Sequence, residues 1–167
     1  MGADADADDG TDSLSLERQV CFALAVANRA VLAVYRPVLE PLGLTHPQYL
    51  VMLALWDRDR RPGEDRTPPS VKAVAETLQM DSATLSPMLK RLETQGLIDR
   101  ARRRGDERTV EVHLTENGRR LRDKALTVPP AVIARLGADI SELEELRDVL
   151  TRINTAALAA GALAPEP

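Results

Sequence analysis

Cys21 is the only cysteine of the chain, and it lies near the start of a long apolar stretch. A thiolate attacks a peroxide oxygen and becomes a sulfenic acid, provided that the thiol pKa is lowered and the sulfur is accessible. Without a second cysteine, the product must become a mixed disulfide with a low-molecular-weight thiol, a backbone sulfenamide or an overoxidised form. A lone cysteine is more often an inert core thiol, so this residue alone leaves both interpretations open.

A hydrogen-bond donor such as the Tyr35 hydroxyl would stabilise such a thiolate. Cys21 and Tyr35 are fourteen residues apart, so on a helix they share a face at about 100° per residue but lie roughly 21 Å apart along the axis. They cannot touch within one straight helix. If two such helices cross antiparallel in a dimer, the Tyr35 hydroxyl of one chain can donate a hydrogen bond to the Cys21 thiolate of the other.

Residues 70–78 and 81–95 have the pattern of two short helices joined by a tight turn, with Asp81 as N-cap and Gly96 after the end. This is a helix-turn-helix. In the second helix Leu85, Met88, Leu89 and Leu92 form an apolar stripe, and the opposite face is polar. The candidate DNA contacts on that face are Ser82, Thr84, Ser86, Pro87, Lys90 and Arg91.

A basic hairpin follows this helix. Runs at 97–103 and 109–114 flank a polar turn at 104–108, which predicts a two-stranded β wing. Four arginines within seven residues repel one another unless a polyanion is bound, although an ion-paired turn is the alternative. We expect Asp106 to orient Arg108 for a minor-groove contact. The wing candidates are Arg102, Arg103, Arg104, Asp106 and Arg108.

The elements that must position these residues are mostly helical. Residues 14–39 repeat apolar positions at helical spacing, Thr45 and Gln48 form a capping box for a helix to about Trp56, and Thr115 caps a helix interrupted near Pro129 and Pro130. We expect a second capping box at Ser141 and Glu144. The predicted fold is mainly α: a winged helix-turn-helix with a two-stranded β wing and a helical dimerisation region from both ends of the chain.

The predicted domain organisation has an acidic tail, which is disordered, at 1–12 and one regulator domain at 13–167. Dimerisation helices occupy 13–44 and 116–160, and the DNA-binding part occupies 46–114 with a charged loop at 57–69. Apolar residues from 143 to 160 follow a heptad spacing, which predicts a seam with a second copy, the alternative being a seam within one chain. A homodimer matches a pseudo-palindromic operator in double-stranded DNA.

Composition agrees with this class. Removing the five aspartates of the tail from the net charge of −4 leaves +1 on the rest of the chain. Hydrophobic residues make up 44% of the chain, which suffices for a core. We found no apolar run long enough for a signal or a membrane span, and a lone cysteine excludes an internal disulfide framework. The expected location is the cytoplasm.

The order of elements resembles the multiple antibiotic resistance regulator (MarR) family, and Asp106-Glu107-Arg108 fits its wing motif. Three stretches are similar to its organic hydroperoxide resistance regulator (OhrR) branch, single-cysteine type: 16–22 (LERQVCF), 35–37 with 42–50 (YRP and LGLTHPQYL), and 85–93 (LSPMLKRLE). The resemblance covers about residues 14 to 155. It implies a repressor that releases DNA when its cysteine is oxidised by an organic hydroperoxide.

The resemblance also implies that two tyrosines of the opposite subunit hydrogen-bond the reactive cysteine. Cys21 and Tyr35 match this pattern, whereas His46 stands at the second tyrosine position. A ring nitrogen can also donate a hydrogen bond, and a protonated imidazole would favour the thiolate, so the expected redox-sensing residues are Cys21, Tyr35 and His46. The alternative is that His46 is an exposed bystander in the first turn of its helix. Ala25, Ala83 and the long 57–69 loop depart further from the family pattern.

Other functions make different demands. A MarR-type repressor released by a small phenolic or other ligand would leave Cys21 incidental, and its DNA binding would ignore hydroperoxide. A thiol peroxidase needs a resolving thiol and gains nothing from a basic wing. A zinc site is disfavoured because Cys21, His46 and His113 lie on separate elements. We therefore expect a regulator, not an enzyme, with no metal, no cofactor and no membrane partner.

Overall fold

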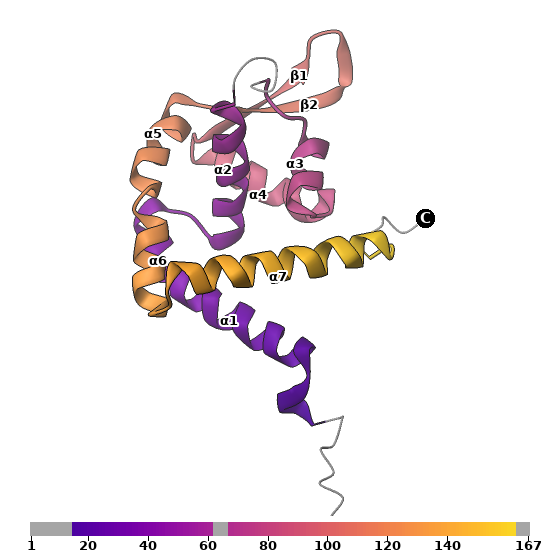
Figure 1. Ribbon diagram of the computed structural model, residues 1–167. Coiled ribbons are helices and arrows are strands. Elements are labelled where there is room, and N and C mark those ends of the chain that lie inside the picture. Colours follow the sequence, from indigo (N-terminus) through magenta and orange to yellow (C-terminus); the bar gives the residue numbers. More distant parts are fainter. Residues whose placement is uncertain (1–14, 62–66, 163–167) are drawn as a thin grey trace, which may run out of the picture.

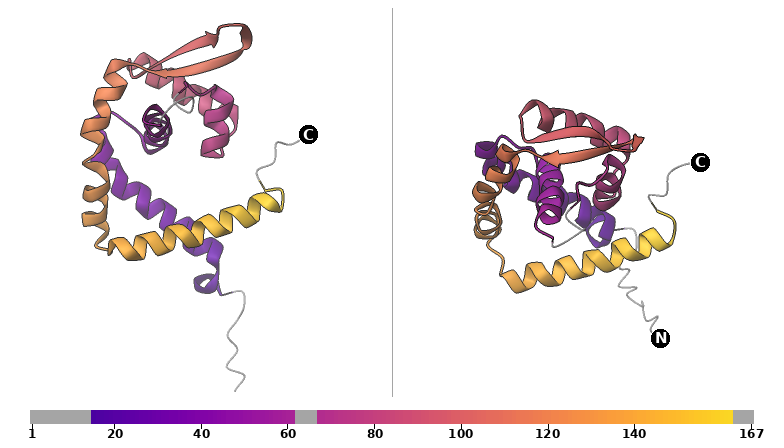
Figure 2. Two further views of the ribbon diagram at one scale, coloured as in Figure 1. Left: turned by 45° about the horizontal axis from the view of Figure 1, so that its top comes forward. Right: turned by 90° about the horizontal axis from the view of Figure 1, so that it is seen from above.

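The computed structural model describes residues 15–61 and 67–162 (Figure 1). The predicted tail at 1–12 lies outside these residues, as does the middle of the predicted 57–69 loop. A winged part holds α2 (His46–Asp59), α3 (Val71–Leu78), α4 (Ser82–Thr94) and the hairpin that follows them. A frame extends from it and consists of α1 (Val20–Leu39), α5 (Glu116–Ala125), α6 (Val128–Leu136) and α7 (Ile140–Ala159). In both views of Figure 2, α7 lies across the molecule from the hairpin.

The N-terminal helix is α1, Val20–Leu39, preceded by a 3-10 turn at Leu16–Arg18 and followed by another at Glu40–Leu42. The helix predicted at 14–39 is confirmed, apart from that first turn. Its surface is apolar yet hardly covered: Leu39 is its only buried residue. The segment Val20–Leu42 has a mean hydropathy of 1.4 and is by length and composition long enough to cross a membrane. The expectation that no run is long enough was wrong, because isolated charges do not outweigh so many apolar neighbours.

Helix α2, His46–Asp59, begins at the predicted capping box, in which Thr45 N–H donates to Gln48 Oε1 at 2.9 Å. It continues three residues past Trp56, so the predicted 57–69 loop starts too early. The charged residues there favour the helix rather than end it. Arg61 forms an ion pair with Asp57 at 2.7 Å, one turn earlier, and Asp59 pairs with Arg119 of α5 at 3.3 Å.

The helix-turn-helix is confirmed. Helix α3, Val71–Leu78, is capped by Ser70, whose Oγ accepts from Ala73 N–H at 3.0 Å. Helix α4, Ser82–Thr94, is capped by Asp81, and Gln79 turns the chain between them with a φ of 52°. The predicted stripe faces the core: Leu85, Leu89 and Leu92 are fully buried and Met88 is half-buried.

The wing consists of β1, Ile98–Arg103, paired antiparallel with β2, Asp106–Leu114. Strand β2 begins three residues earlier than predicted, so Arg104 and Gly105 alone form the turn. A register shift between Arg102 and Arg103 allows this, because a bulge lets a ladder continue past an irregular residue. Gly105 has a φ of 85°, which a residue with a side chain rarely adopts.

Thr115 caps α5, Glu116–Ala125, as predicted, and α6 is Val128–Leu136. Pro129 and Pro130 lie in the first turn of α6, where backbone N–H groups have no helical partner, so they start this helix rather than distort it. Helix α7, Ile140–Ala159, begins after Asp139, whose N–H donates to Glu142 at 3.1 Å. The capping box predicted at Ser141 and Glu144 was wrong, because the same pattern occurs two residues earlier and the chain uses that copy.

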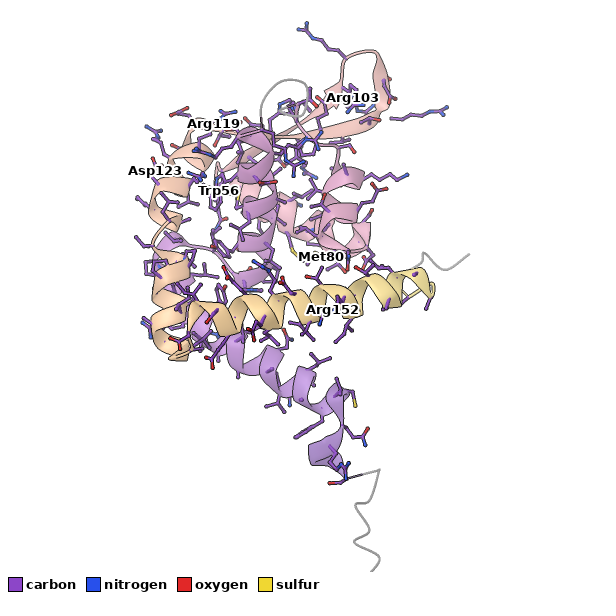
Figure 3. The ribbon with its side chains drawn as sticks, viewed as in Figure 1. Trp56, Met80, Arg103, Arg119, Asp123 and Arg152 are labelled. Atoms are coloured by element: carbon purple, nitrogen blue, oxygen red, sulfur yellow. The ribbon has the colours of Figure 1, made fainter. Side chains whose placement is uncertain are left out.

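The core of the winged part is continuous with the junction between α2, α5 and the wing. Trp56 Nε1 donates to the Gly118 carbonyl at 2.8 Å, and Thr115 N–H donates to the Leu97 carbonyl at 3.1 Å. Gly118 packs directly on the Leu97 carbonyl, leaving no room for a Cβ atom. Figure 3 labels Trp56 on the side of α2 that faces α5. This junction fixes the wing relative to the frame.

Candidate nucleic-acid interface and redox site

Helix α4 presents its polar face to solvent, as the sequence predicts. The six candidates on it are exposed: Ser82, Thr84, Ser86, Pro87, Lys90 and Arg91. Two of the hydroxyls already donate within the helix, since Thr84 Oγ1 donates to Asp81 Oδ2 at 2.7 Å and Ser86 Oγ to the Ser82 carbonyl at 2.6 Å. Towards a ligand these two side chains therefore offer acceptor oxygens.

Pro87 lies inside α4 without ending it. A proline in a helix removes one backbone hydrogen bond, here to the Ala83 carbonyl. Ala83 and Pro87 are both exposed residues, so solvent is available to the carbonyl that loses its helical partner. The flanking Leu85 and Leu89 side chains are fully buried and hold the helix in place.

The four wing arginines are exposed but differ in their partners. Arg103, which Figure 3 labels on the hairpin, donates from Nε to Glu111 at 2.7 Å, and Arg102 lies 4.0 Å from Glu107. Within the described residues Arg104 and Arg108 have no ion-pair partner. The wing tip therefore presents cationic charge that is not neutralised locally, as expected for an element that meets a polyanion.

Asp106 holds the backbone of the wing rather than the Arg108 guanidinium. Its Oδ1 accepts from the Arg108 backbone N–H at 3.1 Å and its Oδ2 from Thr109 Oγ1 at 2.6 Å. These two bonds, led by the one from Thr109, lower the pKa of the carboxyl group. Asp106 thus acts on Arg108 through the backbone rather than through the guanidinium, and the minor-groove contact of Arg108 stays a prediction. Asp106 fixes the turn from which Arg108 projects.

Cys21 is exposed in the first turn of α1. Tyr35 lies on the same unbroken helix, so the spacing of about 1.5 Å per residue keeps the two side chains roughly 21 Å apart along its axis. The structure thus separates the two residues within a protomer, in agreement with the sequence analysis.

At the other end of α1, Tyr35 meets His46, the first residue of α2. Their ring centroids are 4.9 Å apart in an edge-to-face arrangement. Partial burial raises the pKa of Tyr35, which keeps its hydroxyl protonated, and lowers the pKa of His46. A single protomer therefore favours the neutral imidazole rather than the protonated ring we considered. Either ring can still donate one hydrogen bond.

The sequence analysis missed the rings behind this pair. Tyr49 lies 6.1 Å from Tyr35, and Trp56 lies 6.4 Å from Tyr49, measured between ring centroids. Burial, and next the Tyr35 charge, raise the pKa of Tyr49. The signal was available, because Tyr49 and Trp56 are seven residues apart and share a face of α2. Tyr35, Tyr49 and Trp56 therefore form a row of rings from the contact with His46 to the wing junction.

No cluster of three or more histidine, cysteine, aspartate or glutamate side chains is arranged for a metal ion within residues 15–61 and 67–162. His113 lies on β2, where Glu111 is 3.4 Å from its Nε2. Nothing in the described part of the chain supports the zinc alternative.

Comparison with known proteins identifies the family. The family model described as "Transcriptional regulator SarA/Rot" matches residues 33–125. The organic hydroperoxide resistance transcriptional regulator of Bacillus subtilis (strain 168) is 40% identical over 83% of this chain and 89% of its own length.

Two solved structures of AbfR, a protein of Staphylococcus epidermidis, are similar to this fold. Reduced AbfR bound to DNA aligns with a TM-score of 0.71 and 30% identity, over 87% of this chain and 94% of that one. Overoxidised AbfR bound to DNA aligns with a TM-score of 0.62 and 32% identity, over 83% and 94%. The chain thus belongs to the MarR family of transcriptional regulators, together with the organic hydroperoxide resistance regulator of Bacillus subtilis.

Proposed function

We propose that this regulator is a homodimeric repressor that binds a pseudo-palindromic operator and releases it when an organic hydroperoxide oxidises Cys21. One observation carries the proposal. An exposed thiol lies at one end of α1, and a pair of hydrogen-bonding rings, Tyr35 and His46, lies at the other. Two copies of the chain can bring these ends together, whereas one copy cannot.

The need for a second copy follows from the uncovered apolar surface. Helices α1 and α7 are each 20 residues long, and Leu39 is the only residue buried in either of them. Large apolar side chains on both remain exposed: Val20, Leu24, Val26, Ile140, Leu146, Val149, Ile153 and Leu158. Soluble monomers rarely leave so extended an apolar surface in water, so these two helices fit an interface between copies of the chain.

An antiparallel crossing of two α1 helices places Cys21 of each chain near Tyr35 and His46 of its partner. The protonated Tyr35 hydroxyl donates a hydrogen bond to the thiolate, and the neutral His46 ring donates a second from its N–H. Hydrogen bonds to the charged form lower the pKa of a thiol, which increases its reactivity near neutral pH. His46 thus takes the part that a tyrosine hydroxyl plays in the related pattern.

The redox step is a two-electron oxidation of sulfur. The Cys21 thiolate attacks the terminal oxygen of the hydroperoxide and forms an S–O bond while the O–O bond breaks. The alkoxide leaves and takes up a proton to become an alcohol, and Cys21 becomes a sulfenic acid. Because the chain holds no second cysteine, a low-molecular-weight thiol is the natural next partner, forming a mixed disulfide with release of water.

DNA binding uses α4 in the major groove and the wing in the adjacent minor groove. In a two-fold dimer these elements appear twice, which matches the symmetry of a pseudo-palindromic site. AbfR, with the same fold, has been solved bound to DNA. A regulator of this kind acts where the DNA is, in the cytoplasm, and the apolar α1 then serves an interface between subunits rather than a membrane.

The test is a gel shift on the duplex from the chain's own promoter, with and without cumene hydroperoxide. The wild type should bind when reduced, release the duplex after treatment and bind again after reduction with dithiothreitol. Cys21→Ser should bind equally well and should not respond, because serine keeps the shape but cannot form a sulfenate. Release of Cys21→Ser at the wild-type dose would refute the proposal, and cumyl alcohol serves as the matched control.

A further inference from the structure

A hollow of about 440 Å³ lies between α4 and the wing. Its walls come from the start of α3, the middle of α4 and both strands of the hairpin, and Figure 1 shows α3 directly below the hairpin. Its polar lining consists of Ser70, Lys72, Ser86, Arg100, Arg108 and Thr109. None of the described residues that line it is acidic, so the hollow suits an anion.

The position of the hollow suggests which anion. When α4 enters a major groove and the wing enters the neighbouring minor groove, the sugar-phosphate strand that divides the two grooves must cross the gap between them. We propose that the hollow holds a phosphate of this strand, with Lys72 and Arg100 as positioning contacts. Neither residue is among the DNA contacts predicted from the sequence. The proposal rests on the proposed DNA binding.

The walls of the hollow are tied together. Val112 N–H donates to the Pro69 carbonyl at 2.9 Å, and Ser70 forms a bridge with Glu111, so the start of α3 is fixed against β2. Arg100 Nε and Nη2 donate to Glu93 Oε2 at 3.1 and 2.7 Å, which fixes β1 against α4. Because these walls are already fixed, the binding of an anion between them orders little additional chain and costs little conformational entropy.

The ion pair with Glu93 leaves the Nη1 group of Arg100 free of partners within the described residues. The same pair, chiefly through its side-chain hydrogen bond, lowers the pKa of Glu93 and so keeps that carboxylate charged. Because Glu93 already neutralises its charge, Arg100 contributes an oriented hydrogen-bond donor to the hollow more than net positive charge. The excess positive charge comes from Arg108, which has no ion-pair partner in residues 15–61 and 67–162, and from Lys72.

Lys72 is held only weakly in the absence of a ligand. Its Nζ lies 3.8 Å from Glu76, and its side chain is 85% exposed. Among the hydroxyls, Ser86 and Thr109 already donate their protons, to the Ser82 carbonyl and to Asp106. Ser70 Oγ accepts from Ala73 N–H, so its own proton remains available to a phosphate oxygen. A lysine, an arginine and one hydroxyl donor form a suitable phosphate site.

The experiment measures how binding to a mixed-sequence duplex of 30 base pairs depends on salt, for wild type, Lys72→Gln and Lys124→Gln. Lys124 is an exposed lysine in the last turn of α5 and lies outside the hollow. Each phosphate contact contributes about −0.9 to the slope of log K against log salt, so losing one per subunit should flatten the slope of a dimer by about 1.8. At 0.1 M salt the affinity should fall by roughly 60-fold if counterion release is the whole contribution.

Lys124→Gln should retain the wild-type slope, and all three proteins should melt at the same temperature, because both lysines are exposed. A Lys72→Gln slope equal to that of Lys124→Gln, with steep binding by the wild type, would overturn the phosphate site and leave the proposed function intact. Absence of salt-dependent binding by the wild type would instead overturn the proposed DNA binding itself.

Discussion

Gly118→Ala should destabilise the protein although alanine is the better helix former. Gly118 lies in the first turn of α5, where an added Cβ atom would overlap the Leu97 carbonyl oxygen and approach Leu114 Cδ2 at 3.1 Å. The obstacle is backbone at the base of the wing, and it cannot turn away as a side chain could. Helix α5 must therefore move away from the wing.

The magnitude combines three contributions. Overpacking of this kind costs about 3 kcal/mol at the upper end of its usual range. Displacement of α5 also strains the hydrogen bond from Trp56 Nε1 to the Gly118 carbonyl, which contributes about 1 kcal/mol. The higher helix propensity of alanine offsets about 1 kcal/mol of this loss. The net loss is about 3 kcal/mol, which for a chain of this size lowers the melting temperature by about 6 to 12 °C.

Thermal unfolding followed by circular dichroism measures this effect at one protein concentration. Asn117→Ala is the control, because it places an alanine at the neighbouring, exposed position of α5 and removes only an exposed hydrogen bond from Arg120. The control should melt within a degree or two of the wild type. A Gly118→Ala protein as stable as the control would refute the close approach of α5 to the wing.

Three further results are expected. Arg108→Ala should weaken DNA binding without lowering the melting temperature, since its side chain has no partner among the described residues, and unchanged affinity would remove the wing from the interface. Sedimentation at micromolar concentration should show a homodimer, reduced or oxidised, whereas a well-behaved monomer would exclude the shared redox site. In a Cys21→Ser background, which removes the thiolate that the proposed dimer brings to His46, His46→Tyr should lose less stability than the protein with His46 between pH 7 and 5. Burial lowers the pKa of His46 in the fold, so acid protonates the unfolded state first, and the stability that neutral His46 confers above about pH 6.5 is lost as the pH falls. Equal acid sensitivity of the two proteins would show that His46 is not buried in solution.

Local signals in the sequence predicted most of the fold. The caps predicted at Thr45, Asp81 and Thr115 act within three or four residues, and the structure confirms each of them. The errors arose where local chemistry permits two solutions. Asp139 and Ser141 both begin a capping-box pattern, and the chain uses the one at Asp139, two residues after Gly137, the C-cap of α6.

The candidate site was only partly predictable for a physical reason. The exposed face of α4 and the basic wing follow from periodicity and charge. The contact between Tyr35 and His46 depends on how separate elements pack, and so does the hollow that both Lys72 and Arg100 line. Spacing along the chain does not encode that packing. Asp106 shows the same limit, because its spacing from Arg108 indicates a link between the two residues but does not show that the carboxylate binds the Arg108 backbone N–H and the Thr109 hydroxyl.

Oxidation of a mixed dimer tests the redox site shared between subunits most directly. One chain carries Cys21→Ser, and the other carries Tyr35→Phe with His46→Ala, so the dimer has a single thiol. In a shared site that thiol faces the intact Tyr35 and His46 of the other chain, and cumene hydroperoxide should oxidise it at the wild-type rate. Oxidation as slow as in the Tyr35→Phe, His46→Ala homodimer would place the partners of Cys21 within its own chain and contradict the account.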